Sequence, residues 1–366
     1  MMELSKSDTR KLQKVGYDPS GTVPRAGSFL TKDHEVLSSE KKEENLEILP
    51  LETALQKYPW MEELSFGLVP VEKDGYTREV AKRTPVGYFI RALPGAQITR
   101  PVQSCFFIKT VRFSQMVHNI IVAEPDSELH IITGCTTASY VKQGSHIGVT
   151  EFYVRENAQL SYTMIHDWAP QVTVLPRSAA LVEAGGAFIS NYIALTAAEL
   201  VQAYPVATVK RRGIARFNSI IYAPKGAHFD LGAAAKLVEP EAKAEIISRA
   251  ISDGGEVIAR GYLEGGAANT KGHMECSGLL LSDKGSIHAV PELKGNFPET
   301  DLSHEAAVGK IADEEIHYLM TRGLDEETAT SLIVRGFLDV RLKGLPPGLQ
   351  HTIDMMIEKA SLGSAV

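Results

Sequence analysis

Three cysteines are the most reactive side chains in this chain of 366 residues, and none lies in a paired CxxC motif. A cysteine attacks sulfur or binds metal as its thiolate, so a nearby imidazole that lowers its pKa would activate it. Cys135 ends a strand-like run and is followed, eleven and sixteen residues later, by His146 and Glu151. We therefore consider Cys135 as a nucleophile or sulfur acceptor, with a small buried core residue as the alternative. Cys105 lies in an apolar run and is expected in the core.

A second set of candidate ligands combines Cys276 with His304 and Glu305, which follow it by 28 and 29 residues. In a strand, two-residue alternation would place Met274 and Cys276 on one face. Thiolate, imidazole and carboxylate ligands suit iron or zinc better than calcium or magnesium, which prefer oxygen. The alternatives are a core cysteine and a surface turn that binds nothing.

Several classes of function are excluded by motif and charge. The chain has no Gly-x-Ser-x-Gly, no His-Glu-x-x-His and no phosphate-binding loop, so we expect no enzyme active site of those types and no ATPase motif. A net charge of −7 argues against a nucleic-acid surface. No run of 18 apolar residues and no signal-peptide core are present, so we expect no membrane segment. Few cysteines fit a reducing compartment, and we expect a cytoplasmic protein.

The residues from about 100 to 300 form short apolar–polar alternations separated by small or polar turn residues. This texture predicts short strands with one buried face and resembles the rungs of a stacked solenoid. The period is irregular, because Leu129, Leu160, Phe188, Phe229 and Ile246 are 31, 28, 41 and 17 residues apart. A β-sandwich or jelly roll therefore remains the structural alternative.

The two ends of the chain differ from this body. We expect a short helix at 7–16, a loop or extended arm at 18–35 and helical spacing over 39–65, with Pro50 opening a helix. From 312 onward we expect helices capped at Asp313 and Asp325, and a last amphipathic helix that includes Leu349 and Ile353. The predicted organisation is a helical or extended region at 1–95, a strand-rich core at 96–305 and a helical region at 306–366.

Ordered motifs in the second half resemble one known family. The stretches 304–311, 322–327 and 333–337 read HEAAVGKI, RGLDEE and IVRGF, and the stretches 134–138 and 162–168 read GCTTA and YTMIHDW. Together they resemble the SufB/SufD family of iron–sulfur cluster assembly proteins, over roughly residues 95–340. The pattern is closer to SufB, because a glutamate follows the histidine at 304 where SufD-type chains usually have glycine. The residue before that histidine is serine, whereas some SufB-type chains have an acidic residue there.

The resemblance implies a mainly β fold, a right-handed parallel β-helix with α-helical regions at both ends. It implies a scaffold that builds a transient iron–sulfur cluster, 4Fe-4S rather than 2Fe-2S, at a subunit interface. Cys135 matches the family position that receives persulfide sulfur, and we expect its thiol pKa to be lowered. Cys276, His304 and Glu305 match the region of the cluster ligands, with the cysteines binding and one of the other two residues completing the site.

The resemblance also implies partners. A SufC-type ABC ATPase would bind the C-terminal helices and hydrolyse ATP, and the scaffold would pair as a homodimer or a SufB–SufD heterodimer. A sulfur donor and acceptor proteins for the finished cluster are further partners. Two rival readings remain: a cluster-free, SufD-like structural subunit, and a solenoid enzyme acting on polysaccharide. The second would need paired carboxylates along a groove, whereas Asp230, Glu239 and Glu245 are scattered.

Overall fold

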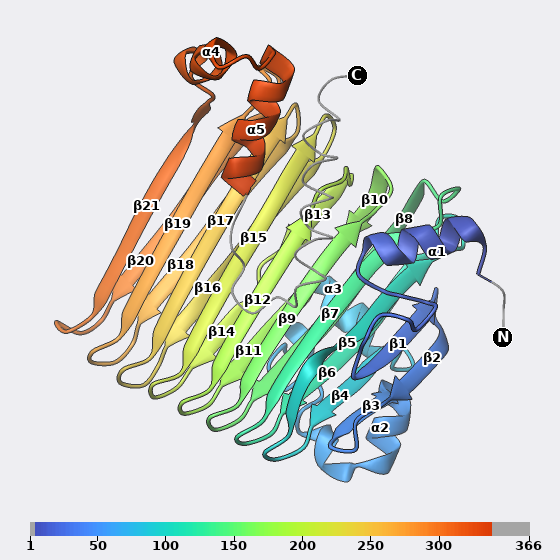
Figure 1. Ribbon diagram of the computed structural model, residues 1–366. Coiled ribbons are helices and arrows are strands. Elements are labelled where there is room, and N and C mark those ends of the chain that lie inside the picture. The colour runs from blue at the N-terminus through green and yellow to red at the C-terminus, as the bar shows by residue number, and fades with distance from the viewer. Residues whose placement is uncertain (1–3, 339–366) are drawn as a thin grey trace.

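The computed structural model describes residues 4–338, and two long sheets dominate it (Figure 1). Sheet A runs in the order β2 (Glu35–Lys41), β1 (Gly27–Lys32), β5 (Gln97–Ile108), β7 (Glu128–Thr137), β9 (Gln159–Asp167), β12 (Ala187–Ala194), β15 (Ile214–Pro224), β17 (Lys243–Asp253), β19 (Lys271–Leu280), β21 (Asp301–Lys310). Sheet B contains β3 (Leu46–Pro50), β4 (Tyr88–Ala92), β6 (Ser114–Ala123), β8 (Gln143–Val154), β10 (Gln171–Val174), β11 (Arg177–Val182), β13 (Leu200–Ala203), β14 (Val206–Val209), β16 (His228–Leu237), β18 (Glu256–Gly265), β20 (Ser286–Gly295).

The chain alternates between the two sheets, so each rung pairs in parallel with the next rung of the same sheet. One column of inward residues in sheet A runs Ile98, Leu129, Leu160, Phe188 and Ala215, at spacings of 31, 31, 28 and 27 residues. This winding makes a parallel β-helix of about eight turns, which confirms the predicted fold class and rules out the antiparallel sandwich.

One turn conformation recurs where the chain passes from sheet B to sheet A. Seven of the eight described turns contain one residue with positive φ, a conformation favoured by glycine, asparagine and aspartate. The seven positions are Gly95, Asp126, Asn157, Gly185, Arg212, Glu241 and Asn269. Because these turns repeat the same geometry, successive rungs stack in register.

The N-terminal region covers one end of the β-helix. It contains α1 (Lys6–Lys14), α2 (Leu51–Lys57), α3 (Gly75–Ala81) and the 3₁₀ turns η1 (Pro59–Glu62) and η2 (Val71–Lys73). The predicted first helix is confirmed, with Ser5 and Asp8 forming a capping box. The helical prediction over 39–65 is wrong before Pro50, because β3 pairs with β4 there and Ile48 faces the core. Helix α2 begins directly after Pro50, as expected.

Two helices follow the last strand. They are α4 (Asp313–Thr321) and α5 (Glu326–Leu338), and Asp325 accepts a hydrogen bond from Thr328 N at 2.7 Å, as expected of a cap. The predicted cap at Asp313 is wrong, because Ala312 occupies the cap position without a side-chain hydrogen bond and Asp313 is the first residue of the helix. The predicted last helix, with Leu349 and Ile353, lies outside the described residues. Between residues 4 and 338, no helix has the length and apolarity needed to cross a membrane.

Candidate functional site

Cys135 lies inside the β-helix, on the inward face of β7, and is 0% exposed. In register, Phe106 of β5 flanks it on one side and His166 of β9 on the other. Burial raises the pKa of the Cys135 thiol well above its ordinary value. The prediction that the pKa of Cys135 is lowered is therefore wrong. Burial disfavours the thiolate, and no neighbouring cation in the described part of the chain stabilises it.

A cluster of aromatic and polar side chains shares the lumen with Cys135. The Nδ1 atom of His166 lies 2.9 Å from the hydroxyl of Tyr192, and the His166 and Trp168 rings are 5.6 Å apart. His166 Nε2 and Trp168 Nε1 are buried and have no hydrogen-bond partner among the described residues. Unpaired polar atoms are unusual in a protein interior, so these two are candidates for contacting a ligand.

The structure separates the two residues that follow Cys135 in the sequence. His146, on β8, points into the lumen and lies 5.1 Å from the Trp168 ring, and burial lowers its pKa to about 3. Glu151, on the same strand, points outward and is fully buried against the segment 66–69. Its carboxylate accepts hydrogen bonds from Phe66 N, Leu68 N and Val69 N at 2.8, 2.6 and 3.0 Å. Glu151 is thus an anchor for this segment and lies outside the Cys135 cluster.

Helix α1 covers the outer face of the same strands. Lys11 and Lys14 both form ion pairs with the buried carboxylate of Asp167. Val15 packs so closely on Gly134 that no side chain larger than hydrogen fits there. Side chains in the lumen therefore surround the Cys135 thiol, and α1 covers the outer face of the strand that carries it.

A cavity of about 80 Å³ lies between the sheets and extends along the lumen from this cluster. Its inner lining includes Tyr162, Tyr192, Ser219 and Ser248. Ser248 is the register neighbour of Cys276 on the next strand of sheet A. The cavity therefore spans most of the path between the two candidate cysteines.

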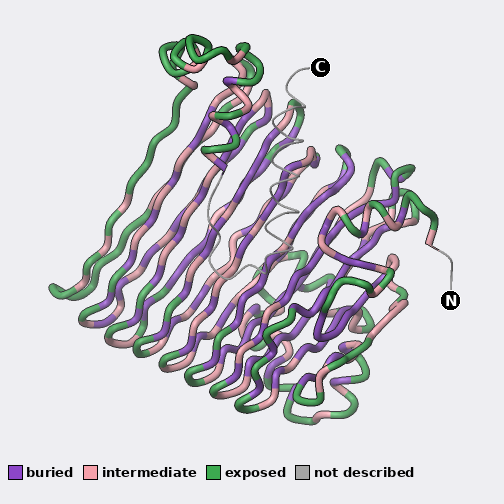
Figure 2. Tube along the Cα trace, in the orientation of Figure 1, coloured by how far each residue is buried: buried purple, intermediate pink, exposed green. Residues whose placement is uncertain are grey.

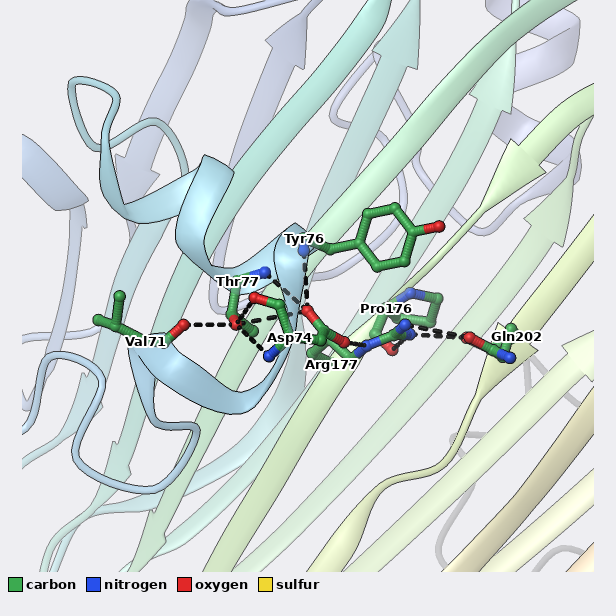
Figure 3. Close-up of polar contacts among 7 residues, drawn as sticks. All are labelled: Val71, Asp74, Tyr76, Thr77, Pro176, Arg177 and Gln202. Atoms are coloured by element: carbon green, nitrogen blue, oxygen red, sulfur yellow. Dashed lines mark hydrogen bonds and ion pairs between the residues drawn. The ribbon is translucent and has the colours of Figure 1, made fainter.

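An arginine fixes the sheet B wall of this cavity (Figure 3). Arg177 directly follows Pro176, a lining residue, and its Nη1 and Nη2 donate to the backbone oxygen and the Oε1 of Gln202 at 3.2 and 3.1 Å. Its Nε donates to Asp74 at 2.5 Å, and Asp74 also caps α3 through Tyr76 N. The contacts tie α3 to two rungs of sheet B, which holds the cavity wall in place.

Cys276 and His304 lie on the same inward face of adjacent strands, β19 and β21. Cys276 is 3% exposed and its register neighbour is Ala306, while the register neighbour of His304 is Met274. Burial raises the pKa of the Cys276 thiol, and Glu275 adds to the effect. His304 Nε2 is buried without a hydrogen-bond partner among the described residues. The structure thus brings the thiol and the imidazole to neighbouring positions, two residues out of register.

Glu305 does not share that face. It is exposed, and its register neighbour Glu275 bonds to Arg249 at 2.7 Å on the outer surface of sheet A. Within residues 4–338, no three His, Cys, Asp or Glu side chains come close enough to hold a metal ion. A cluster site at this position would therefore need ligands from outside this part of one chain.

The Cys276 end of the β-helix is also its open end. Burial falls toward β20 and β21 in Figure 2, and the backbone edges of these strands have no partner strand among the described residues. Inward-pointing residues of the last rung are exposed there, including Val308 and Leu293 at 43% each. Solenoid ends need a cap with a polar outer face, and residues 4–338 provide no strand that caps this end.

Sequence reasoning missed His166 and Tyr192 as members of the Cys135 cluster. His166 follows Cys135 by 31 residues, the same step that separates Leu129 from Leu160. Applying that step to the cysteine would have identified its neighbour, but the irregular overall period hid it.

The fold and its buried cysteines define a β-helical protein with a largely apolar internal cavity that contains a few hydroxyl groups. Residues 106–337 match the family described as SUF system FeS cluster assembly, SufBD core domain. The chain belongs to this SufBD family of iron–sulfur cluster assembly proteins. The identification confirms the family resemblance drawn from the motifs.

Three relatives illustrate the similarity. An iron-sulfur cluster assembly SufBD family protein of Archaeoglobus fulgidus is 46% identical over 353 residues, covering 96% of this chain and 95% of the relative. A protein of the same description from Methanothermobacter thermautotrophicus is 42% identical, covering 99% and 89%. The iron-sulfur cluster assembly protein SufB of Bacillus subtilis is 31% identical over 275 residues, covering 74% and 58%.

Proposed function

We propose that this protein is a scaffold subunit that receives persulfide sulfur at Cys135 and assembles an iron–sulfur cluster at an interface between two subunits. The observation that carries the proposal is the placement of Cys276 and His304 side by side at the open end of the β-helix. A thiol and an unpaired imidazole nitrogen at that position are suitable ligands for cluster iron, which is thiolate-bound with histidine as a known replacement.

Pairing through the open end would complete the site. A second subunit at this end would cover exposed Val308 and Leu293 and bring a second pair of ligands. Two copies of Cys276 and His304 supply four ligands, the number that a four-iron cluster needs. Glu305 lies on the outer face, so we assign the histidine rather than the glutamate to complete the site. The partner subunit is a second copy of this chain or a SufD-type relative.

Sulfur would travel from Cys135 to Cys276 through the lumen. Five inter-strand steps separate β7 from β19 in sheet A, and steps of about 4.8 Å add up to about 24 Å. Sulfur transfer between two thiols requires contact at about 3–3.5 Å. The third cysteine, Cys105, is in register with Gly134, whose side faces α1, so it does not bridge the gap. We therefore assign the transit to a small sulfur species moving through the cavity, whose mostly apolar lining includes the hydroxyl-bearing residues Tyr192, Ser219 and Ser248.

An ABC-type ATPase would drive opening of the interface. Helix α4 has exposed apolar residues, Tyr318 and Met320, that suit a docking surface. Helix α5 is fixed to sheet A, where Arg249 of β17 lies 5.7 Å from the Phe337 ring. A partner bound to these helices could therefore pull on the strands beside Cys276. Nucleotide would drive that motion only by binding one arrangement of the ATPase pair more tightly.

The second candidate is a SufD-like structural subunit that binds no cluster. The raised pKa of the buried Cys135 thiol favours it, because such a thiol is a poor nucleophile. Anaerobic reconstitution with iron and sulfide separates the two functions, since the scaffold develops visible absorption and the structural subunit stays colourless.

The decisive experiment compares three variants in that reconstitution. We expect Cys276→Ala to lose the cluster absorption and its Mössbauer signal, whereas Cys105→Ala, a matched change at an outward-facing cysteine, retains both. Glu305→Ala should also retain them. Equal cluster yield in Cys276→Ala and wild type would contradict the ligand assignment.

A further inference from the structure

The lumen beside Cys135 contains an imidazole on the neighbouring strand, with one ring nitrogen unpaired within residues 4–338. His166 is the register neighbour of Cys135 on the same inward face, so their backbones are about 4.8 Å apart. His166 is 2% exposed, its Nδ1 lies 2.9 Å from the Tyr192 hydroxyl, and its Nε2 has no hydrogen-bond partner among the described residues. An imidazole held at one nitrogen leaves the other free to act as a base. No hydrogen bond joins Nε2 to the Cys135 thiol in this arrangement, so the two side chains must turn toward each other for the transfer.

We propose that His166 Nε2 takes the thiol proton of Cys135 when Cys135 receives sulfur, and that Tyr192 sets the tautomer by binding Nδ1. This inference rests on the proposed function and deepens it by naming the residue that activates the acceptor. The substrate class is a small persulfide or inorganic disulfide, R–S–S–H, that fits the lumen.

The step balances without an external oxidant or reductant. The Cys135 sulfur attacks the outer sulfur of R–S–S–H as its proton moves to Nε2. The donor S–S bond breaks, R–S⁻ leaves and takes the proton from Nε2, and the products are Cys135–S–S–H and R–S–H. One S–S bond breaks and one forms, so the number of electrons on the sulfur atoms is unchanged.

The charge environment explains why a base is needed. Desolvation holds the Cys135 thiol protonated, and burial lowers the pKa of His166, which keeps its imidazole neutral and able to accept a proton. The titratable groups that face His166 are Cys135 on β7, His146 on β8 and Tyr192 on β12, and burial holds each of them in its neutral form. Asp167 and its two lysines lie on the outer face of the sheet. No charged group in the described part of the lumen could therefore take the thiol proton in place of His166.

The test measures sulfur uptake by the full-length protein from anaerobic inorganic disulfide, with quenching by alkylation and mass analysis of the Cys135 peptide. We expect His166→Gln to slow uptake by about 100-fold or more at neutral pH. We also expect its rate to rise about tenfold per pH unit as hydroxide replaces the base, whereas the wild-type rate stays flat near neutrality. His130→Gln is the matched control, because His130 lies on the outer face of the strand that carries Cys135 and bonds Ser161.

Each result decides a different claim. Uptake in His166→Gln at the wild-type rate and with the wild-type pH profile overturns this inference and leaves Cys135 as the acceptor. Absence of sulfur on Cys135 in the wild type overturns the acceptor assignment, and the inference falls with it. If His166→Gln melts early by circular dichroism, Tyr192→Phe decides: a slower, pH-dependent uptake supports the role, and an unchanged profile refutes it.

Discussion

Blocking the lumen next to Cys276 should stop sulfur before it reaches the cluster site. Ser248 lines the cavity and is the register neighbour of Cys276, so Ser248→Leu places a branched apolar side chain in this cavity next to that thiol. Burying the added carbons contributes about 1.5–3 kcal/mol, and overpacking opposes it by about 1–3 kcal/mol. The free energy of unfolding should therefore change by less than about 2 kcal/mol, and the variant should fold.

The assay loads Cys135 with labelled sulfur, removes excess donor and follows the label on the two cysteine peptides. We expect Ser248→Leu to load Cys135 at the wild-type rate and to deliver at least about tenfold less label to Cys276, since reacting atoms must approach to about 3–3.5 Å. Ser277→Leu makes the same change on the outer face of β19 and should deliver label normally. Equal delivery in the two leucine variants would refute a route through the lumen.

Three further predictions concern assembly and stability. Val308→Lys puts a charge on the open end and should shift a paired scaffold to monomer in sedimentation, whereas unchanged mass would argue against pairing there. Glu151→Gln leaves at least one backbone donor of the segment 66–69 unpaired and should lower the free energy of unfolding by about 3–5 kcal/mol in denaturant titration; a loss below about 1 kcal/mol would contradict the anchor. Burial opposes ionisation of Asp167, but Lys14 and Lys11 outweigh it and hold its pKa below the usual value. The docking of α1 should therefore be fully stabilised above about pH 4 and weaken as pH falls further, read from amide protection in α1, and Asp167→Asn should remove that pH dependence.

The strand-rich body and its winding were largely predictable, but the rung period was not recognised. Leu129, Leu160 and Phe188 do form one column, at 31 and 28 residues. Phe229 belongs to sheet B, so adding it to the series produced the apparent break. The left-handed turn residues give the clearer signal, because one occurs in each of the first seven of the eight described passages from sheet B to sheet A.

The candidate site was predictable as a set of residues but not as a geometry. Two-residue alternation already implies that His304 and Glu305 point to opposite faces if both lie in a strand, and the structure has them so in β21.

The segment before Pro50 illustrates a different limit. Its apolar spacing fits a helix locally, yet pairing with β4 makes it a strand, a tertiary effect that local pattern does not contain.

The two ends of the β-helix differ in how they are covered, and the lumen lies between them. Helices and the β1–β2 hairpin cover the end near Cys135, whereas the rung beside Cys276 exposes its inward residues. The described part of the lumen between them retains unpaired polar atoms, among them His166 Nε2, Trp168 Nε1 and the Tyr162 hydroxyl, each of which costs about 1–3 kcal/mol relative to a paired group. That sum is a sizeable part of the roughly 5–15 kcal/mol by which a domain is stable. If the protein were only a structural subunit, aliphatic side chains at those positions would make it more stable. The retention of unpaired polar side chains therefore favours the proposal that a polar or sulfur-bearing species passes through the lumen.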